Sequence, residues 1–235
     1  GNIDALDAVL ARTPRDSYDR LLILGDLVGY GAAPNEVVSR IFDLEPDVIV
    51  RGNHDKVSTG IEGIDTFQRV AGEAARWTQN ALTASNLERV AGIPAGPKNV
   101  DRDVEVCHGT PLDENTYVLD EKDAARALDS SHRKICFFGQ THIPVAYARR
   151  GSKLTVTHPQ PGGPSNTVVH VDGSNGSATE RRWLPSSSAR GLSSRLPSSP
   201  TRPSHAASVL RMTVMIGAAS VDYFKVASLR TMTRS

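Results

Sequence analysis

Apolar residues recur along the chain in two spacings, one typical of amphipathic helices and one typical of buried strands. The helical spacing predicts helices over residues 3–12, 34–44, 67–82, 85 to about 92 and 120–128. Short apolar runs predict strands over residues 19–24, 47–51, 103–107, 134–138, 143–148 and 153–157. Pro34 suits the first turn of its helix, and Ser85 followed by Glu88 predicts a capping box. Because strands and helices alternate, the sequence predicts an α/β domain with partly parallel strands.

Polar residues and glycines cluster at the ends of four predicted strands. The clusters are Gly25-Asp26, Gly52-Asn53-His54-Asp55, His108-Gly109 and Gly139-Gln140-Thr141-His142. Ligand sites in α/β sheets form at the carboxyl ends of the strands, so we expect these side chains to converge. The glycines allow the backbone to turn sharply and to approach a ligand closely.

The chemistry of these clusters favours a metal site. Carboxylate, amide and imidazole groups supply oxygen and nitrogen donors, which suit Mn, Fe, Zn or Ni and differ from the thiolates of structural zinc sites. Asp26 can bridge two cations, Asn53 offers a carbonyl oxygen, and His108 and His142 offer imidazoles. Two ions about 3.5–4 Å apart polarise a phosphoryl group and hold a hydroxide for in-line attack.

Each cluster also has a purely structural interpretation. A Gly-Asp pair after a strand is commonly a turn, and a histidine at a strand end is commonly held by structural hydrogen bonds. Residues 53–55 are also compatible with an Asx-turn that caps a helix. The same chemistry at four strand ends favours the metal site over these alternatives.

The four motifs resemble, in the same order, those of the calcineurin-like metallophosphoesterases, above all the small bacterial and archaeal phosphodiesterase branch. The similar segments are GDLVGYG (25–31), VRGNHD (50–55), CHGTP (107–111) and FGQTHIP (138–144). The resemblance implies a metallophosphoesterase domain over residues 1–157. It also implies a four-layer α/β/β/α sandwich around two mixed sheets, with a dinuclear centre of divalent metal ions.

The resemblance also implies roles for the predicted ligands. Asp26 would bridge the two ions. Asn53 and His108 would bind one ion with a contribution from Gln140, and His142 would bind the other.

The implied activity is metal-dependent hydrolysis of small-molecule phosphate esters, as a phosphodiesterase or phosphatase, by a metal-activated hydroxide. His54 would contact the phosphate or protonate the leaving oxygen, and Asp55 would hold the imidazole ring in orientation. The alternative function is a catalytically impaired metal- or phosphate-binding relative, because part of the ligand set is missing.

Three features depart from the family pattern. The first motif, a strand followed by Asp-x-His-Gly-Asn, is represented only by Gly1-Asn2, so the first strand and two ligands of the His142 ion are absent. Gln140 stands where the family has His, and its amide oxygen is a weaker ligand. The family's Asn-Pro-Gly-Ser segment is replaced by HPQPGG at 158–163. We therefore expect nearer one than two bound ions, and an unpaired strand edge where the first strand is missing.

The charge distribution separates a body from a tail. The net charge is +1, but residues 1–180 carry 18 basic and 25 acidic side chains, whereas residues 181–235 carry 9 basic and 1 acidic. Residues 181–205 contain 8 Ser, 5 Arg and 4 Pro, so we expect residues 158–235 to form a low-complexity, disordered basic tail. Out-of-frame translation is the favoured origin, with a natural flexible tail or a nucleic-acid-binding arm as alternatives.

Composition excludes several further classes of protein. With 39% apolar residues the chain can fill a core, which excludes whole-chain disorder. Cys107 and Cys136 lie in apolar runs and are expected to be reduced thiols, so a disulfide-stapled secreted scaffold is excluded. No uncharged apolar run reaches the roughly 18 residues that span a bilayer, and no signal peptide is evident. We expect a cytoplasmic protein whose partners include neither membranes nor nucleic acid.

Overall fold

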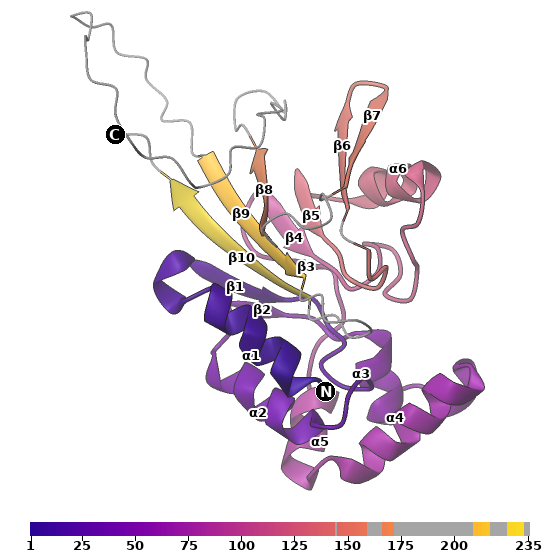
Figure 1. Cartoon of the computed structure of the whole chain (residues 1–235). Helices are drawn as coiled ribbons and strands as arrows, with labels where there is room; N and C mark the ends of the chain where they lie inside the picture. Colours follow the sequence, from indigo (N-terminus) through magenta and orange to yellow (C-terminus); the bar gives the residue numbers. More distant parts are fainter. Residues whose placement is uncertain (144, 159–165, 172–208, 217–224, 233–235) are drawn as a thin grey trace, which may run out of the picture.

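The computed structural model describes residues 1–143, 145–158, 166–171, 209–216 and 225–232, the last three segments by their backbone. Its α-helices are α1 Ile3–Arg12, α2 Pro34–Asp43, α3 Asn53–Ser58, α4 Arg69–Ala81, α5 Ala84–Ala91 and α6 Glu121–Ser130. Its strands are β1 Arg20–Ile23, β2 Val48–Ile49, β3 Lys98–Asn99, β4 Val104–Val106, β5 Ile135–Phe137, β6 Ala146–Arg150, β7 Lys153–Thr157, β8 Asn166–Val171, β9 Val209–Ile216 and β10 Lys225–Met232. The predicted α/β class is confirmed (Figure 1).

The strands form two sheets and a hairpin. The larger sheet has the order β2-β1-β10-β9-β8, the smaller has the order β3-β4-β5, and β6 pairs with β7. β1 is parallel to β2, and β4 is parallel to β5. Parallel neighbours end at the same edge of a sheet, so the loops that follow β1 and β2 emerge together, as do those that follow β4 and β5.

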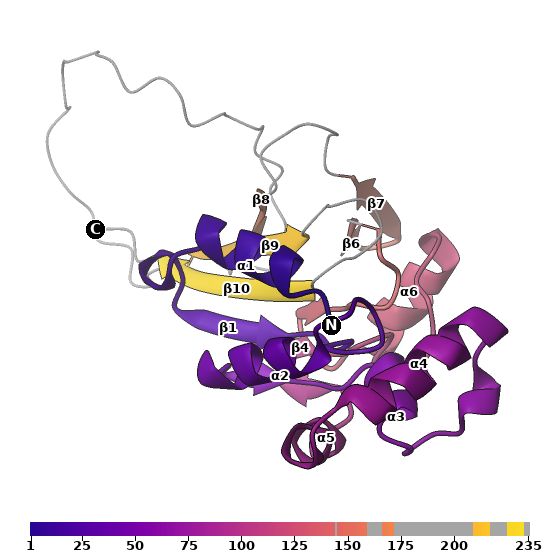
Figure 2. The same cartoon turned by 60° about the horizontal axis from the view of Figure 1, so that its bottom comes forward.

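Alternating side chains on β1 build two cores. Leu21 and Ile23 belong to the cluster that includes residues of α1, α2 and α5, and this cluster lies on the helix side of the large sheet. Leu22 and Leu24 belong to the second cluster, with Val104 and other residues of the small sheet. The period of two along a strand therefore places β1 between a helix layer and the second sheet (Figures 1 and 2).

Side-chain caps begin several helices. Asn2 Oδ1 accepts the Ala5 N–H at 2.9 Å at the start of α1. The capping box predicted at Ser85 is wrong, because α5 begins at Ala84 and its N-cap is Thr83, whose hydroxyl accepts the N–H of Asn86 at 3.3 Å. The N–H of Thr83 is itself held by Asn35 Oδ1 of α2 at 2.9 Å, which fixes the residue at the helix start.

The structure differs from the predicted tail in three segments. β8, β9 and β10 lie within residues 158–235, and β10 pairs antiparallel with β1, Leu22 lying opposite Ala227. The strand edge beside β1 is thus paired rather than open, which satisfies backbone groups that a bare edge would leave exposed. Residues of these strands, such as VLRMTVMI at 209–216, are rich in the types that favour strands. The Ser-, Arg- and Pro-rich stretch 181–205 lies outside the described residues.

Two other expectations concern cysteines and membranes. Cys107, directly after β4, and Cys136, on β5, are free thiols, as predicted, and their Sγ atoms lie 3.5 Å apart. Among the described residues, no helix combines the length and the apolar character that crossing a bilayer requires.

Candidate active site

The ends of β1, β2, β4 and β5 bring the predicted ligands together around one imidazole. His108 is fully buried, and its Nε2 lies 3.3 Å from Asp26 Oδ2, 3.3 Å from Asn53 Oδ1 and 2.9 Å from Gln140 Oε1. The expected convergence of these four residues is therefore observed. Their role as metal ligands stays a prediction.

The other nitrogen of His108 indicates how the ring is used. Nδ1 lies 2.6 Å from the carbonyl oxygen of Leu24, at the end of β1. When Nδ1–H donates to this carbonyl, a neutral ring directs its Nε2 lone pair toward the three oxygens. A histidine ligand held by a backbone carbonyl at its second nitrogen is the usual arrangement around protein metals.

The donor chemistry suits a divalent cation at this point. One carboxylate, one imidazole and two amide oxygens form a set of hard-to-borderline donors. Within the described parts of the chain, no three His, Cys, Asp or Glu side chains are grouped so as to hold an ion by themselves. A cation at this point would depend on the amide oxygens of Asn53 and Gln140, which are neutral donors.

Asp26 is shared between two parts of the site. Its Oδ2 lies 3.3 Å from His108 Nε2 and 3.9 Å from His142 Nε2, so one carboxylate oxygen faces both imidazoles. Its Oδ1 accepts the backbone N–H of His54 at 3.2 Å. The side chain of His142 is 26% exposed, whereas that of His108 is fully buried.

Three site residues hold an unusual backbone conformation. Asp26, Gln140 and His142 have φ values of +58°, +51° and +58°. Residues other than glycine rarely adopt this left-handed backbone region, and such strain is found preferentially at functional sites. No sequence pattern indicates this conformation, because the neighbouring glycines are the residues expected to form the turns.

Asp55 makes backbone contacts that the sequence does not indicate. Its carboxylate accepts four backbone N–H groups, those of Asp26 (2.9 Å), Leu27 (2.8 Å), Val28 (3.2 Å) and Gly52 (2.8 Å). Asp55 thus joins the loop after β1 to the turn after β2, and its expected role in orienting the His54 ring stays a prediction. Burial and the charge of Asp26 raise the pKa of Asp55 to about 6, against the lowering effect of the Gly52 and Val28 N–H groups.

Two aromatic rings contact the ring of His54. Its ring centroid lies 4.0 Å from that of Tyr30 and 4.7 Å from that of Phe67. Tyr30 also meets His142 edge-on, with centroids 5.4 Å apart, so one tyrosine contacts both histidines. Tyr30 lies within a predicted motif, but nothing in the spacing of Phe67 connects it with the site.

The turn after β2 requires glycine at position 52, because Asp26 and His108 lie too close to leave room for a side chain. A Cβ added there would lie 2.5 Å from the backbone nitrogen of Asp26 and 2.7 Å from His108 Cε1, and it would collide with the Asp26 carboxylate. Glycine before Asn53 therefore lets the turn after β2 lie directly against the loop after β1.

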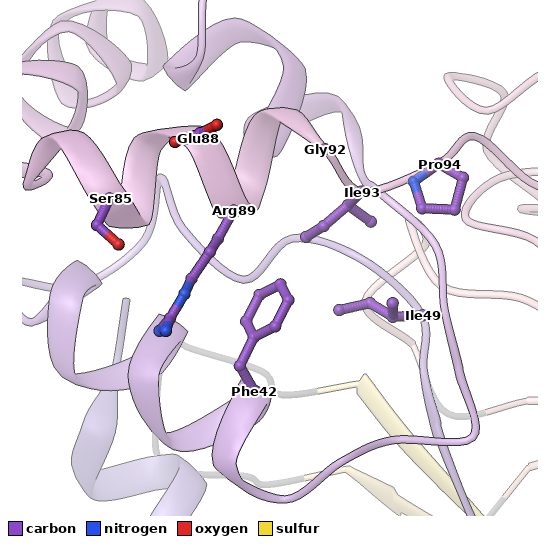
Figure 3. Close-up of a pocket in the computed structure, with 8 residues that line it drawn as sticks. All are labelled: Phe42, Ile49, Ser85, Glu88, Arg89, Gly92, Ile93 and Pro94. Carbon is purple, nitrogen blue, oxygen red and sulfur yellow. The ribbon is translucent and has the colours of Figure 1, made fainter.

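A separate pocket lies away from these residues. It has a volume of about 440 Å³ and opens between the end of α2, β2 and α5 (Figure 3). Its lining residues, none of which belongs to the predicted site, are Phe42, Ile49, Ser85, Glu88, Arg89, Gly92, Ile93 and Pro94.

Comparison with known proteins agrees with this geometry. A sequence model of the calcineurin-like phosphoesterase superfamily domain matches residues 1–175. An uncharacterized protein of Methanocaldococcus jannaschii is 31% identical over 155 residues, which are 65% of this chain and 63% of that protein. The crystal structure of a metallophosphoesterase from Sphaerobacter thermophilus is 34% identical, with a TM-score of 0.59, and the match covers 72% of this chain and 66% of that one. The chain thus spans just under two thirds of the length of either relative.

Proposed function

The chain belongs to the calcineurin-like phosphoesterase superfamily, whose members hydrolyse phosphoesters with divalent metal ions, and on that premise we propose that it is a metal-dependent phosphoesterase acting on small molecules. The observation that carries the proposal is the arrangement around His108, where Asp26, Asn53 and Gln140 each direct an oxygen to the same imidazole nitrogen. These four residues would hold one ion. His142, together with the shared Asp26 carboxylate, would contribute to a second.

Divalent ions at such a centre supply positive charge that polarises a phosphoryl group and lowers the pKa of water. The chain itself positions the residues that act on the substrate. His54 is 6% exposed, and its backbone is tied to Asp26 while its ring packs between Tyr30 and Phe67. In this role His54 contacts the phosphate or donates a proton to the leaving oxygen.

The second candidate function is a metal- or phosphate-binding relative with impaired catalysis. The observation that favours it is the small donor set beside His142, where the proposal assigns a second ion only His142 and the shared Asp26 carboxylate. Among the described residues, the His142 side of the site offers a second ion fewer ligand atoms than the His108 side offers the first. Such a protein would bind an ion at His108 without turning over an ester.

Hydrolysis of bis-p-nitrophenyl phosphate distinguishes the two functions. The purified chain is incubated with the diester and Mn²⁺, Zn²⁺ or Ni²⁺, and p-nitrophenolate release is followed with EDTA and with Asp26→Ala as controls. An esterase releases product only with metal and loses this activity in Asp26→Ala. Retained Mn²⁺ binding with no release under any metal would favour the impaired relative.

A further inference from the structure

A buried ionic cluster lies beside the site and includes none of the predicted ligands. The cluster consists of Arg51, Lys56, Glu62 and Glu114. Arg51 donates two hydrogen bonds to the Glu114 carboxylate, at 3.2 and 3.1 Å. Lys56 Nζ lies 2.6 Å from Glu62 Oε2 and 3.1 Å from Glu114 Oε1.

Burial makes this cluster more than a surface ion pair. The Lys56 side chain is 6% exposed and that of Glu114 is 16% exposed. Burial raises the pKa of Glu114, but hydrogen bonds and charge from Arg51 and Lys56 outweigh it and leave the pKa below its ordinary value. Glu114 is therefore ionised at neutral pH, and removing one partner would leave a buried charge uncompensated.

A chain of hydrogen bonds connects the cluster to the candidate metal centre. Lys56 Nζ donates to Asn115 Oδ1 at 2.9 Å. The backbone carbonyl of Asn115 accepts the side-chain amide of Gln140 at 3.1 Å, and the amide oxygen of Gln140 lies 2.9 Å from His108 Nε2. Lys56 thus acts on Gln140 through a single intervening residue.

The contact with Asn115 determines which end of the Gln140 amide faces the centre. The NH₂ group of a glutamine must face an acceptor, and here that acceptor is the Asn115 carbonyl. The oxygen is consequently directed at His108. Without this contact, a neutral side chain with several rotatable bonds could turn its amide either way.

We propose that Lys56 and Glu114 are positioning residues, which hold Asn115 in place and so direct the Gln140 amide oxygen toward the ion-binding side of His108. The inference rests on the proposed function, because it requires an ion at this centre. It assigns the cluster a role in metal affinity. It also explains how the amide oxygen of Gln140, a weak ligand, is kept directed toward the ion-binding side of His108.

Isothermal titration of the full chain with Mn²⁺ tests the inference. Lys56→Met should weaken Mn²⁺ affinity about 10-fold or more, the effect typical of residues that support a ligand from behind. Asn115→Ala is the second variant, because it removes the side-chain amide whose oxygen Lys56 contacts, on an exposed residue, and keeps the backbone carbonyl that Gln140 uses. Arg69→Met is the matched control, since Arg69 forms an exposed ion pair with Glu73 on α4, and it should leave Mn²⁺ affinity unchanged.

A double variant separates positioning from general stability. If Lys56 acts through Gln140, the Lys56→Met/Gln140→Leu protein should bind Mn²⁺ no more weakly than Gln140→Leu alone. Unfolding midpoints measured in EDTA report the structural cost of each change separately. Additive losses of affinity in the double variant, or unchanged affinity in both Lys56→Met and Asn115→Ala, would overturn the inference.

The readout also distinguishes this inference from the proposed function. A chain that binds Mn²⁺ with the predicted coupling but hydrolyses no ester would refute the esterase and leave the positioning role standing. A chain that binds Mn²⁺ without the coupling would refute the positioning role alone. An unmodified chain with no Mn²⁺ binding would overturn both.

Discussion

The carboxylate of Asp55 holds the backbone of Asp26, whose N–H it accepts at 2.9 Å. The side chain of Asp55 thereby holds the main chain of Asp26, and the two acidic residues lie side by side in a buried site. With three further N–H groups bound, Asp55 fixes the loop that presents Asp26 to both imidazoles. It acts on the candidate centre through the backbone, which is a structural role.

Asp55→Asn should therefore destabilise the metal-free protein. An amide can accept at one oxygen only, so some of the four N–H groups would face an NH₂ group. The expected loss is about 2–4 kcal/mol of unfolding free energy, since buried groups left without a partner cost on that scale. Urea denaturation in EDTA measures it, with Asp43→Asn at an exposed helix end as control. Equal stability of the two variants would contradict the role given to Asp55.

Gly52→Ala tests the close approach of the two loops. The added methyl group would displace Asp26 or His108, so Mn²⁺ binding should be lost and stability should fall by about 1–3 kcal/mol. Gly72→Ala on α4 is the matched control, because its Cβ would make contacts of 3.4 Å or longer. Titration calorimetry and thermal denaturation report the two effects. Normal Mn²⁺ affinity in Gly52→Ala would show that the loops have room to move apart.

His54→Ala separates catalysis from metal binding. If His54 contacts the phosphate or protonates the leaving oxygen, hydrolysis of bis-p-nitrophenyl phosphate should fall about 10²–10⁴-fold. Metal content should change little, because His54 is not among the proposed ligands. Asp26→Ala, measured beside it, should lose both metal and activity. A His54→Ala protein that loses its metal as fully, or that keeps full activity, would return His54 to a structural role.

Much of the fold and site follows from local sequence. β1 could be predicted because its apolar run stops at Gly25-Asp26. Such features depend on periodicity and on turn-forming residues, which a single segment carries by itself. Parallel pairing brings the ends of β1 and β2 together in one sheet and those of β4 and β5 in the other, but that the two pairs face each other depends on how the sheets pack.

Other features depend on contacts between distant segments. The rings of Tyr30 and Phe67 contact His54 from separate loops, and Lys56 pairs with Glu114, which is distant in the sequence, so no local pattern shows either contact. Helix α3 is too short for apolar periodicity to predict, and it begins within the Asn53-His54-Asp55 motif, for which a helix cap is only the alternative interpretation. The pairing of β10 with β1 likewise joins opposite ends of the sequence.

Metal content tests the central claim most directly. The chain and Asp26→Ala are loaded with Mn²⁺, dialysed and analysed by inductively coupled plasma mass spectrometry. The ligand set around His108, with the weaker His142 side, predicts nearer one ion than two in the unmodified chain. Asp26→Ala should retain almost none, because both sides of the site use its carboxylate. Two firmly retained ions would contradict the ligand count, and metal content that Asp26→Ala leaves unchanged would contradict the site itself.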